Sequence, residues 1–272
     1  MSLFRHGLVA VLLVAATTQV GAAPTPASVL VEELTWTELR DAIKAGKTTV
    51  IVPVGGTEQS GPHMVLGKHN VRARALAARI AASLGNALVA PVMAYVPEGD
   101  VNPPTGHMKY PGSVTLPDEP FMKVVEYAAR SFKVSGFKDI VFIGDSGPNQ
   151  KGMKAVAERL NKEWKGTGVR IHYSSGYYTA GYSPDGEFVK WLHSQGETRE
   201  AIGGHAGILD TSQLMAVDPH LVRTEKRAPG GDYKATGVDG NPARATIEYG
   251  KKGLQMKIEK AVAEIRASMA KK

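Results

Sequence analysis

The feature that most constrains the fold is an apolar run leading directly into a polar loop rich in glycine and proline. Residues 48–54 are apolar enough to form a buried strand, and residues 53–70 read PVGGTEQSGPHMVLGKHN. A helical pattern begins at about residue 71, so the loop joins a strand to a helix. In open α/β sheets, ligands bind outside the carboxyl ends of the strands. The loop carries a carboxylate and imidazoles, which bind metals or transfer protons, so the sequence predicts a site here.

The rest of the chain continues this alternation of strands and helices. Residues 35–40 are expected to start a helix with a capping box, in which Thr35 is the cap and Glu38 lies three residues later. Further strands are expected at 87–94, 138–143 and 169–174, and helices at 71–84, 120–135, 151–165, 188–194, 209–217 and 243–270. This pattern predicts an α/β fold with a mostly parallel central sheet flanked by helices. Residues 24–272 are interpreted as a single domain, with loops at 97–118, 176–187 and 227–243.

The first 23 residues have the features of a secretory signal peptide. Arg5 and His6 precede an apolar stretch at 8–16, and small residues follow at 21–23. The apolar stretch is shorter than the roughly 20 residues that span a bilayer. A buried N-terminal helix is the alternative, but Pro24 and Pro26 would end it at once. We therefore expect bacterial export to the periplasm or medium, with no membrane anchor.

Composition restricts the kinds of site that the chain can build. There is no cysteine, so any metal must be held by histidine, carboxylate, backbone or water ligands. Lysine and arginine number 33 against 26 acidic residues, but the basic residues are spread along the chain rather than clustered. A nucleic-acid-binding face needs a basic cluster, so nucleic acid is not expected as a partner.

Polar side chains occur on three loops that follow strands or precede helices. The first loop carries Glu58, His63 and His69, the second carries Asp145, and the third carries His205 and Asp210. Because the ends of parallel strands meet at one edge of a sheet, these loops are expected to converge. A purely structural role is the alternative: Glu58 would bind loop amides, His63 would fix the turn at 61–62, and Asp145 would cap the helix that begins near residue 147.

Five segments, in order along the chain, resemble signatures of the creatininase (creatinine amidohydrolase) family. Residues 53–69, PVGGTEQSGPHMVLGKH, are similar to PVGSTEQHGPHLPLGTD. Residues 106–116 resemble EHxxFPGTISL, residues 144–149 resemble NGHGGN, residues 205–212 resemble HAGExETS, and 237–250 matches a family-like tail. The resemblance implies a layered α/β sandwich, commonly a homo-oligomer such as a hexamer. It also implies hydrolysis of cyclic or linear amides at a centre of two divalent metals, commonly zinc or manganese.

The chain departs from the family at several positions where the resemblance implies metal ligands. Ser60, His69, Ser146 and Pro148 stand where the family has His, Asp, His and, in creatininase itself, Glu, and Ile208 replaces a further Glu. Serine hydroxyls are poor ligands, and a neutral imidazole does not replace a bridging carboxylate between two dications. The sequence therefore predicts a single divalent metal per subunit.

The resulting hypothesis is an exported hydrolase of a small linear or cyclic amide. Its predicted ligands for zinc or manganese are Glu58, His69 and Asp145, with water completing the coordination. His205 is the predicted proton donor to the leaving group, and His107, Glu98 and Asp210 are expected to contact the substrate. The alternative is a catalytically inactive, metal-free binding or scaffold protein with the same fold.

Overall fold

The fold is built on a parallel sheet, seen here in a computed structural model that describes residues 28–271. Four strands lie in the order β2-β1-β3-β4, and each neighbouring pair is parallel. The strands are β1 (Thr49–Val54), β2 (Ala87–Val89), β3 (Asp139–Gly144) and β4 (Arg170–Tyr173). The parallel sheet expected from the sequence is confirmed, although β2 is shorter than the predicted strand at 87–94. The predicted signal peptide lies outside the described residues.

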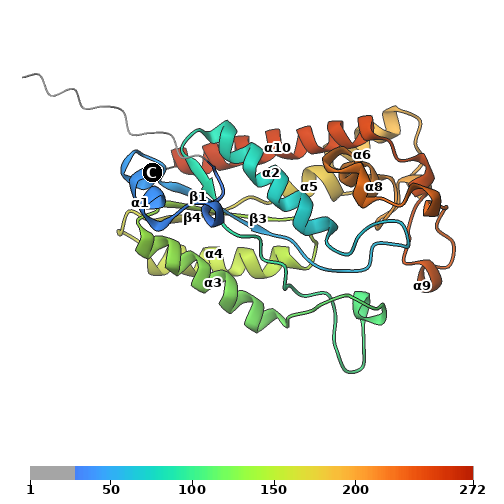
Figure 1. Ribbon diagram of the computed structural model, residues 1–272, viewed down its shortest axis with the longest axis horizontal. Helices are drawn as coiled ribbons and strands as arrows, with labels where there is room; N and C mark the ends of the chain where they lie inside the picture. The colour runs from blue at the N-terminus through green and yellow to red at the C-terminus, as the bar shows by residue number, and fades with distance from the viewer. Residues whose placement is uncertain (1–27, 272) are drawn as a thin grey trace, which may run out of the picture.

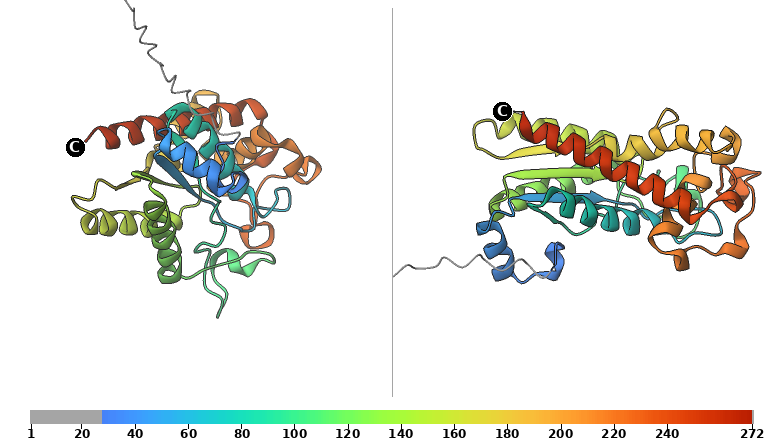
Figure 2. Two further views of the ribbon diagram at one scale, coloured as in Figure 1. Left: turned by 60° about the vertical axis from the view of Figure 1, so that its left-hand side comes forward. Right: turned by 90° about the horizontal axis from the view of Figure 1, so that it is seen from above.

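Helices cover both faces of the sheet, which explains why every residue of β1 is buried. Val50, Val52 and Val54 pack toward α3 and α4, whereas Ile51 packs toward α2 and α10. Figures 1 and 2 show these helices as two layers with the sheet between them. The helices of the two layers are α2 (Lys68–Leu84), α3 (Asp118–Ser135), α4 (Asn149–Glu163) and α10 (Ile247–Ala270). Each buried aliphatic side chain in these layers contributes roughly 1.5–3 kcal/mol to folding.

The N-terminal helix α1 (Trp36–Lys44) begins as its sequence predicts. The Thr35 side chain accepts a hydrogen bond from the backbone of Glu38, whose carboxylate accepts one from the backbone of Thr35. This reciprocal pair is the capping box expected from the sequence. Among the described residues, no helix combines the length and apolar character needed to cross a membrane.

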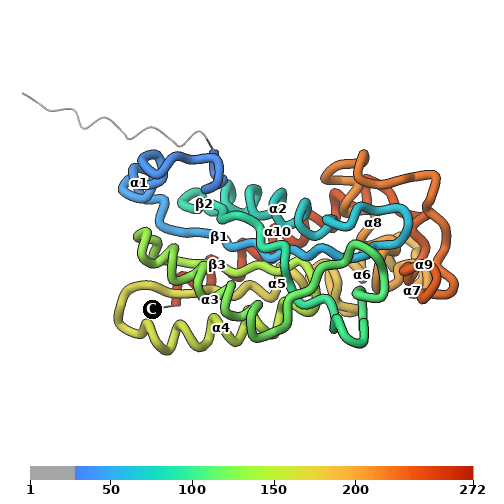
Figure 3. Tube along the Cα trace, turned by 60° about the horizontal axis from the view of Figure 1, so that its bottom comes forward, coloured from blue at the N-terminus to red at the C-terminus, as the bar shows by residue number. Residues whose placement is uncertain are grey.

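Short helices gather beyond the carboxyl ends of the strands. Figure 3 shows the segments that follow β1 and β3 running toward this cap of helices. The helices of the cap are α5 (Gly176–Tyr182), α6 (Glu187–Ser194), α7 (Arg199–Ile202), α8 (Ile208–Val217) and α9 (Tyr233–Thr236). The 3-10 turns are η1 (Val31–Glu33), η2 (Gly106–Lys109), η3 (Pro219–Leu221), η4 (Thr224–Lys226) and η5 (Pro242–Arg244).

The sequence interpretation was wrong at 176–187, where a loop was expected and α5 forms instead. Tyr177 and Ala180 are buried in α5, and Gly176 and Gly181 allow its backbone to lie close against side chains of α10. The Gly/Tyr-rich composition therefore reflects close helix packing rather than a turn. Because α5 packs here, its tyrosines face the ends of the strands.

Candidate active site

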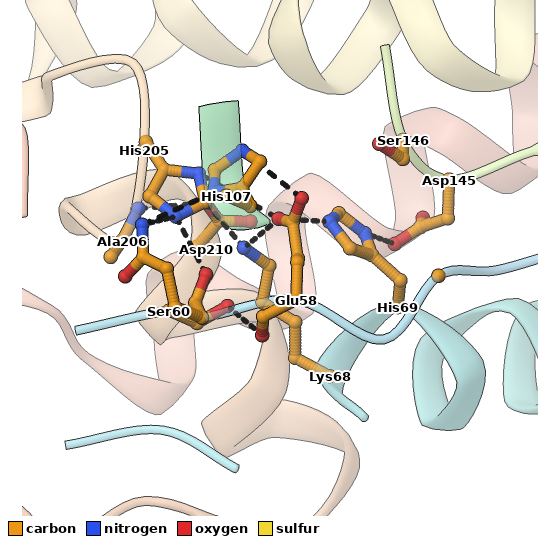
Figure 4. Close-up of polar contacts among 12 residues, drawn as sticks. Glu58, Ser60, Lys68, His69, His107, Asp145, Ser146, His205, Ala206 and Asp210 are labelled. Atoms are coloured by element: carbon orange, nitrogen blue, oxygen red, sulfur yellow. Dashed lines mark hydrogen bonds and ion pairs between the residues drawn. The ribbon is translucent and has the colours of Figure 1, made fainter. Parts of the chain in front are cut away.

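Side chains from segments far apart in the chain meet at the carboxyl edge of the sheet (Figure 4). They surround a cavity of about 250 Å³ whose wall includes Glu58, His107, Asp145, His205 and Asp210. These residues come from the loop after β1, the turn η2, the loop after β3 and the region before and within α8. The convergence expected from the strand order is thus present.

The loop after β1 is held against α2 by close backbone packing. The amide of Gly56 donates to Asn70 Oδ1 at 2.9 Å, and Asn70 Nδ2 donates to Thr57 Oγ1 at 3.1 Å. A Cβ at Gly55 would lie 2.1 Å from Asn70 Oδ1, so only glycine fits at that position. On the other side, Asn149 Nδ2 donates to the carbonyl of Gly55 at 2.8 Å. These contacts place Glu58 beside the first turn of α2.

His69 lies between two of the carboxylates predicted to share a metal with it. Its Nε2 is 2.8 Å from Glu58 Oε1, and its Nδ1 is 2.8 Å from Asp145 Oδ2. Both ring nitrogens are therefore engaged within the protein. The three predicted ligands are neighbours, but they form a hydrogen-bonded row and do not surround a common point.

Asp145 is fully buried, and both of its oxygens are already occupied. Oδ1 accepts from Lys257 Nζ at 2.7 Å and from the hydroxyl of Tyr177 at 2.9 Å. Oδ2 accepts from Arg72 Nε at 2.9 Å, and Arg72 Nη2 lies 2.7 Å away. Burial opposes ionisation, but Arg72 and Lys257 outweigh it and lower the pKa of Asp145. The suggestion that Asp145 caps the next helix was wrong, because the N-cap of α4 is Pro148 and no side chain caps it.

A second pair of buried charges lies next to Glu58. Lys68 Nζ is 3.0 Å from Glu58 Oε1 and 3.5 Å from Asp210 Oδ2. Asp210 Oδ1 also accepts from Arg72 Nη1 at 2.9 Å and from the hydroxyl of Tyr182 at 2.8 Å. Burial alone would raise the pKa of Asp210. Lys68 and Arg72 have the larger, opposite effect, so the pKa lies well below its ordinary value. Asp210 thus anchors the base of the cavity, and its contact with substrate stays a prediction.

The sequence reasoning missed Lys68, Arg72 and Lys257, although a signal for them was present. Lys68 and Arg72 are four residues apart, so they share one face of a helix that begins next to the acidic loop. Lys257 lies within the apolar stripe of α10, among Leu254, Ile258 and Ala261. A lysine at such a position must be buried with a partner carboxylate. Burial lowers the pKa of Lys257 to about 8, so this lysine remains mostly protonated at neutral pH.

A different set of donors does converge on one point in the cavity. Glu58, His107 and His205 each offer a ligand atom, and these atoms lie within 4.8 Å of one another. Glu58 Oε2 is 3.2 Å from His107 Nε2, and Glu58 Oε1 is 3.7 Å from His205 Nδ1. Two ligands placed about 2.1 Å from a tetrahedral ion are about 3.4 Å apart. This carboxylate and two imidazoles therefore fit one divalent cation.

Both imidazoles of this set are in the protonation state that a metal requires. Burial lowers the pKa of His205 to about 3, and the nearby Lys68 acts in the same direction. Burial also lowers the pKa of His107. The two rings are therefore neutral at physiological pH, and their centroids lie 4.6 Å apart. A metal ion that binds these rings therefore does not have to displace a proton from an imidazolium.

Gln59 holds these two histidines in place. Its Nε2 lies 3.2 Å from His107 Nδ1, 3.1 Å from His205 Nε2 and 3.2 Å from the hydroxyl of Tyr233. His205 Nε2 is also 3.0 Å from the carbonyl oxygen of Gln59. When His205 Nε2 donates to that carbonyl, the lone pair of Nδ1 faces Glu58, and the contact of Nε2 with the Gln59 amide nitrogen is a packing contact. When the amide nitrogen donates to His107 Nδ1, the proton of this ring is on Nε2, next to Glu58 Oε2, so metal binding at Nε2 requires exchange to the other tautomer. Such outer contacts fix the orientation of metal-binding histidines.

Glu98 and His63 lie behind the cavity rather than in its wall. Neither carboxyl oxygen of Glu98 has a hydrogen-bond partner among residues 28–271, and burial raises its pKa to about 10. Its predicted contact with substrate stays a prediction. His63 is fully buried next to Gly61, and its Nε2 lies 2.9 Å from Thr211 Oγ1. Burial lowers the pKa of His63 to about 4.

Most of the carboxylates of the site already contact protein cations. The buried carboxylates Glu58, Asp145 and Asp210 are already paired with Lys68, Arg72 and Lys257. At Ser60 and Ser146 the chain offers hydroxyls, which are poor ligands at neutral pH, and at Pro148 it offers no side-chain ligand. Among residues 28–271, the donor atoms that converge are those of Glu58, His107 and His205. Glu58 Oε1 contacts Lys68, whereas Oε2 faces His107.

Comparison with known proteins identifies similar chains. Residues 32–265 match the family model Creatininase, described as creatinine amidohydrolase. The chain is 25% identical over 199 residues to a creatinine amidohydrolase of Pseudomonas putida, covering 73% of this chain and 75% of that protein. It is 28% identical over 187 residues to a mycofactocin precursor peptide peptidase of Mycolicibacterium smegmatis, covering 66% of this chain and 62% of that protein.

Solved structures show the same fold. A crystal structure of creatinine amidohydrolase (creatininase) superposes with a TM-score of 0.74 at 24% identity, covering 90% of this chain and all of that one. A second structure, titled "Creatininase Mn", gives a TM-score of 0.73 at 24% identity and covers 89% of this chain and 99% of that one. At this identity, the likeness establishes the layered α/β architecture.

Proposed function

The chain belongs to the creatininase family, and from this premise we propose that it is an amide hydrolase that uses one divalent metal ion. The observation that carries the proposal is the convergence of Glu58, His107 and His205 in the wall of the cavity. The position of these residues at the carboxyl edge of a parallel sheet supports a catalytic centre.

The comparisons support the reaction class and the kind of metal. One relative is named an amidohydrolase and another a peptidase, and both names describe hydrolysis of a carbon–nitrogen bond. Structural neighbours are titled with manganese and as a "Zn-Zn type". We therefore propose zinc or manganese as the ion and a small linear or cyclic amide as the substrate.

The residues of the cavity divide into those that hold the ion and those that contact the substrate. When bound, the ion lowers the pKa of a water toward about 7 and polarises the amide carbonyl. Glu58, His107 and His205 hold the ion, and Gln59 orients the two rings. Burial raises the pKa of Tyr178 to about 12 and that of Tyr233 to about 12. Both phenols stay protonated at neutral pH and can donate hydrogen bonds to the substrate.

This assignment changes the role of His205. The sequence hypothesis makes it the proton donor to the leaving group. In the structure, Nε2 lies against Gln59 and Nδ1 faces Glu58, so no ring nitrogen is free to donate once Nδ1 binds a metal. We assign His205 to the metal and the hydrogen bonds to the substrate to the tyrosines.

Titration of the purified protein with Zn²⁺ and Mn²⁺ tests the proposal directly. About one ion per chain should bind, and His107→Ala and His205→Ala should each abolish binding, whereas the exposed His220→Ala should not. The loaded protein should then hydrolyse at least one member of a panel of creatinine, other small cyclic amides and short peptides. If neither ion binds, the proposal of a metal-dependent hydrolase is wrong.

A metal-free binding or scaffold protein is the second candidate. It is favoured by the pairing of Glu58, Asp145 and Asp210 with protein cations, because the site is electrostatically balanced without any ion. The same titration separates the two candidates, since this one predicts no binding of zinc or manganese by the unaltered chain.

We also propose that the protein is exported and forms a homo-oligomer. The charge and apolar pattern of residues 1–23 supports export, and N-terminal sequencing of protein from a periplasmic fraction should begin near residue 24. Exposed Val124, Tyr127 and Val134 on α3 support association, since Val134 is 89% exposed. Light scattering after size exclusion should give a multiple of the chain mass, and a monomer would contradict this proposal.

A further inference from the structure

The inner end of the site is a cluster of buried opposite charges centred on Asp145. We infer that Lys257 and Arg72, together with Lys68, take the place of a second metal ion in this chain, so that its centre holds one divalent cation. The inference rests on the proposed function for the single ion at Glu58, His107 and His205. It concerns a different location, the carboxylate of Asp145.

The geometry at Asp145 is that of an occupied cation site. Lys257 Nζ lies 2.7 Å from Oδ1 and Arg72 Nη2 lies 2.7 Å from Oδ2, and all three side chains are fully buried. The remaining positions around the carboxylate are taken by Tyr177 and His69. A divalent ion would have to displace one of the two cations, because both would otherwise repel it across a buried site.

The two cations are enclosed in a way that fixes them there. Lys257 Nζ lies over the rings of Tyr177 and Tyr182, 4.3 and 4.8 Å from their centroids. Arg72 Cζ lies 5.5 Å from the centroid of Tyr182. Such cation–π contacts favour a buried positive charge. A Cβ at Gly181 would come within 2.8 Å of Lys257 Cδ, so the backbone of α5 leaves room for the lysine stem.

The balance of charge leads to the same conclusion. The three buried carboxylates Glu58, Asp145 and Asp210 contact three basic side chains, Lys68, Arg72 and Lys257. Their formal charges sum to zero before any metal binds. One further ion at the outer end can be held by the imidazoles of His107 and His205 with Glu58, whose Oε2 faces His107 while Oε1 contacts Lys68. A second ion at Asp145 would add two positive charges next to Lys257 and Arg72. The buried carboxyl group that has no hydrogen-bond partner among residues 28–271, Glu98, lies beside Glu58.

Removal of the Lys257 side chain, followed by titration with metal, tests this inference. In Lys257→Ala, Asp145 loses a cation and a space opens beside it. We expect this variant to bind two Mn²⁺ or Zn²⁺ ions per chain where the unaltered protein binds one. Its Tm should fall without metal and recover on addition of either ion. Lys260→Ala, which removes an exposed lysine of the same helix paired with Glu187, is the matched control and should resemble the unaltered protein.

Each outcome of the titration has a defined meaning. Two ions in the unaltered protein would overturn the inference while leaving the metal-dependent hydrolase intact. No ion in the unaltered protein, with metal recovery of Lys257→Ala, would overturn the proposed function and the single ion at the outer end. It would still support the replacement of a metal by Lys257 at Asp145. If the alanine variant does not fold without metal, recovery on refolding with Mn²⁺ supports the inference. A variant that neither binds an additional ion nor recovers with metal contradicts it.

Discussion

His69 Nδ1 lies 2.8 Å from Asp145 Oδ2, and this contact joins the two ends of the site. The other ring nitrogen lies 2.8 Å from Glu58 Oε1. At the inner end Asp145 contacts Lys257 and Arg72. At the outer end Glu58 contacts Lys68 and also faces the imidazoles of His107 and His205. His69 is thus the boundary between a charge cluster and a candidate metal centre.

Replacing His69 with asparagine should affect stability more than metal stoichiometry. The shorter amide cannot contact both Glu58 and Asp145, so at least one buried hydrogen-bonding contact of His69 is lost, at a cost of about 1–3 kcal/mol. Urea denaturation should show this loss, and titration with Zn²⁺ should still give about one ion. If His69→Asn abolishes binding and His107→Ala does not, the ligand set predicted from sequence is correct instead.

Replacing Gln59 with leucine should weaken the metal centre without removing a ligand. The amide nitrogen contacts both candidate metal histidines, so its loss frees the two rings to rotate. Changes in such outer contacts typically reduce metal affinity about 10- to 100-fold. Calorimetric titration should show the weaker affinity at unchanged stoichiometry. The exposed Gln195→Leu serves as control, and equal affinities in the two variants would rule out this role for Gln59.

Gly237→Ala should weaken metal binding through Gln59. Gly237 has φ +66°, and an added Cβ would lie 2.0 Å from Gln59 Oε1. The substitution should cost about 1 kcal/mol or more for the backbone alone and should displace the Gln59 amide. Gly231→Ala is the control, since an added Cβ there meets nothing within 4 Å. Affinity should fall only in the first variant, and an unchanged affinity there would show that Gln59 has another way to orient the histidines.

His63 should make the folded state less stable in acid. Its pKa is lowered from 6.5 to about 4 by burial, so between these values the unfolded chain binds a proton that the folded chain does not. Stability therefore falls as the pH falls from 6.5 to about 4, by an amount on the order of 3 kcal/mol.

His63→Gln tests this effect while keeping a polar group near Thr211. Urea denaturation of both proteins at several pH values gives the difference between their stabilities, and the other titrating groups are common to both. The variant should gain relative stability steadily between pH 6.5 and 4. A constant difference over this range would show that His63 does not titrate as described.

Much of the fold was predictable because it depends on local pattern. The apolar runs at β1, β3 and β4 identified three strands, and the Thr35–Glu38 box marked the start of α1. Ordered motifs identified the family. The error at α5 has a physical cause: a segment rich in glycine and tyrosine is a poor helix by propensity, and burial against α10 overrides that preference.

The site was only partly predictable, because sequence locates acidic and basic residues but does not pair them. Sequence alone determined the sheet, the family and the neighbourhood of Glu58, His69 and Asp145. Tertiary structure decided that His107 and His205 join Glu58, and that Lys257 reaches Asp145 from the C-terminal helix. The physical reason is burial, because an unpaired charge is costly in the interior. Which partner each charge contacts depends on the packing of segments that are far apart in the chain.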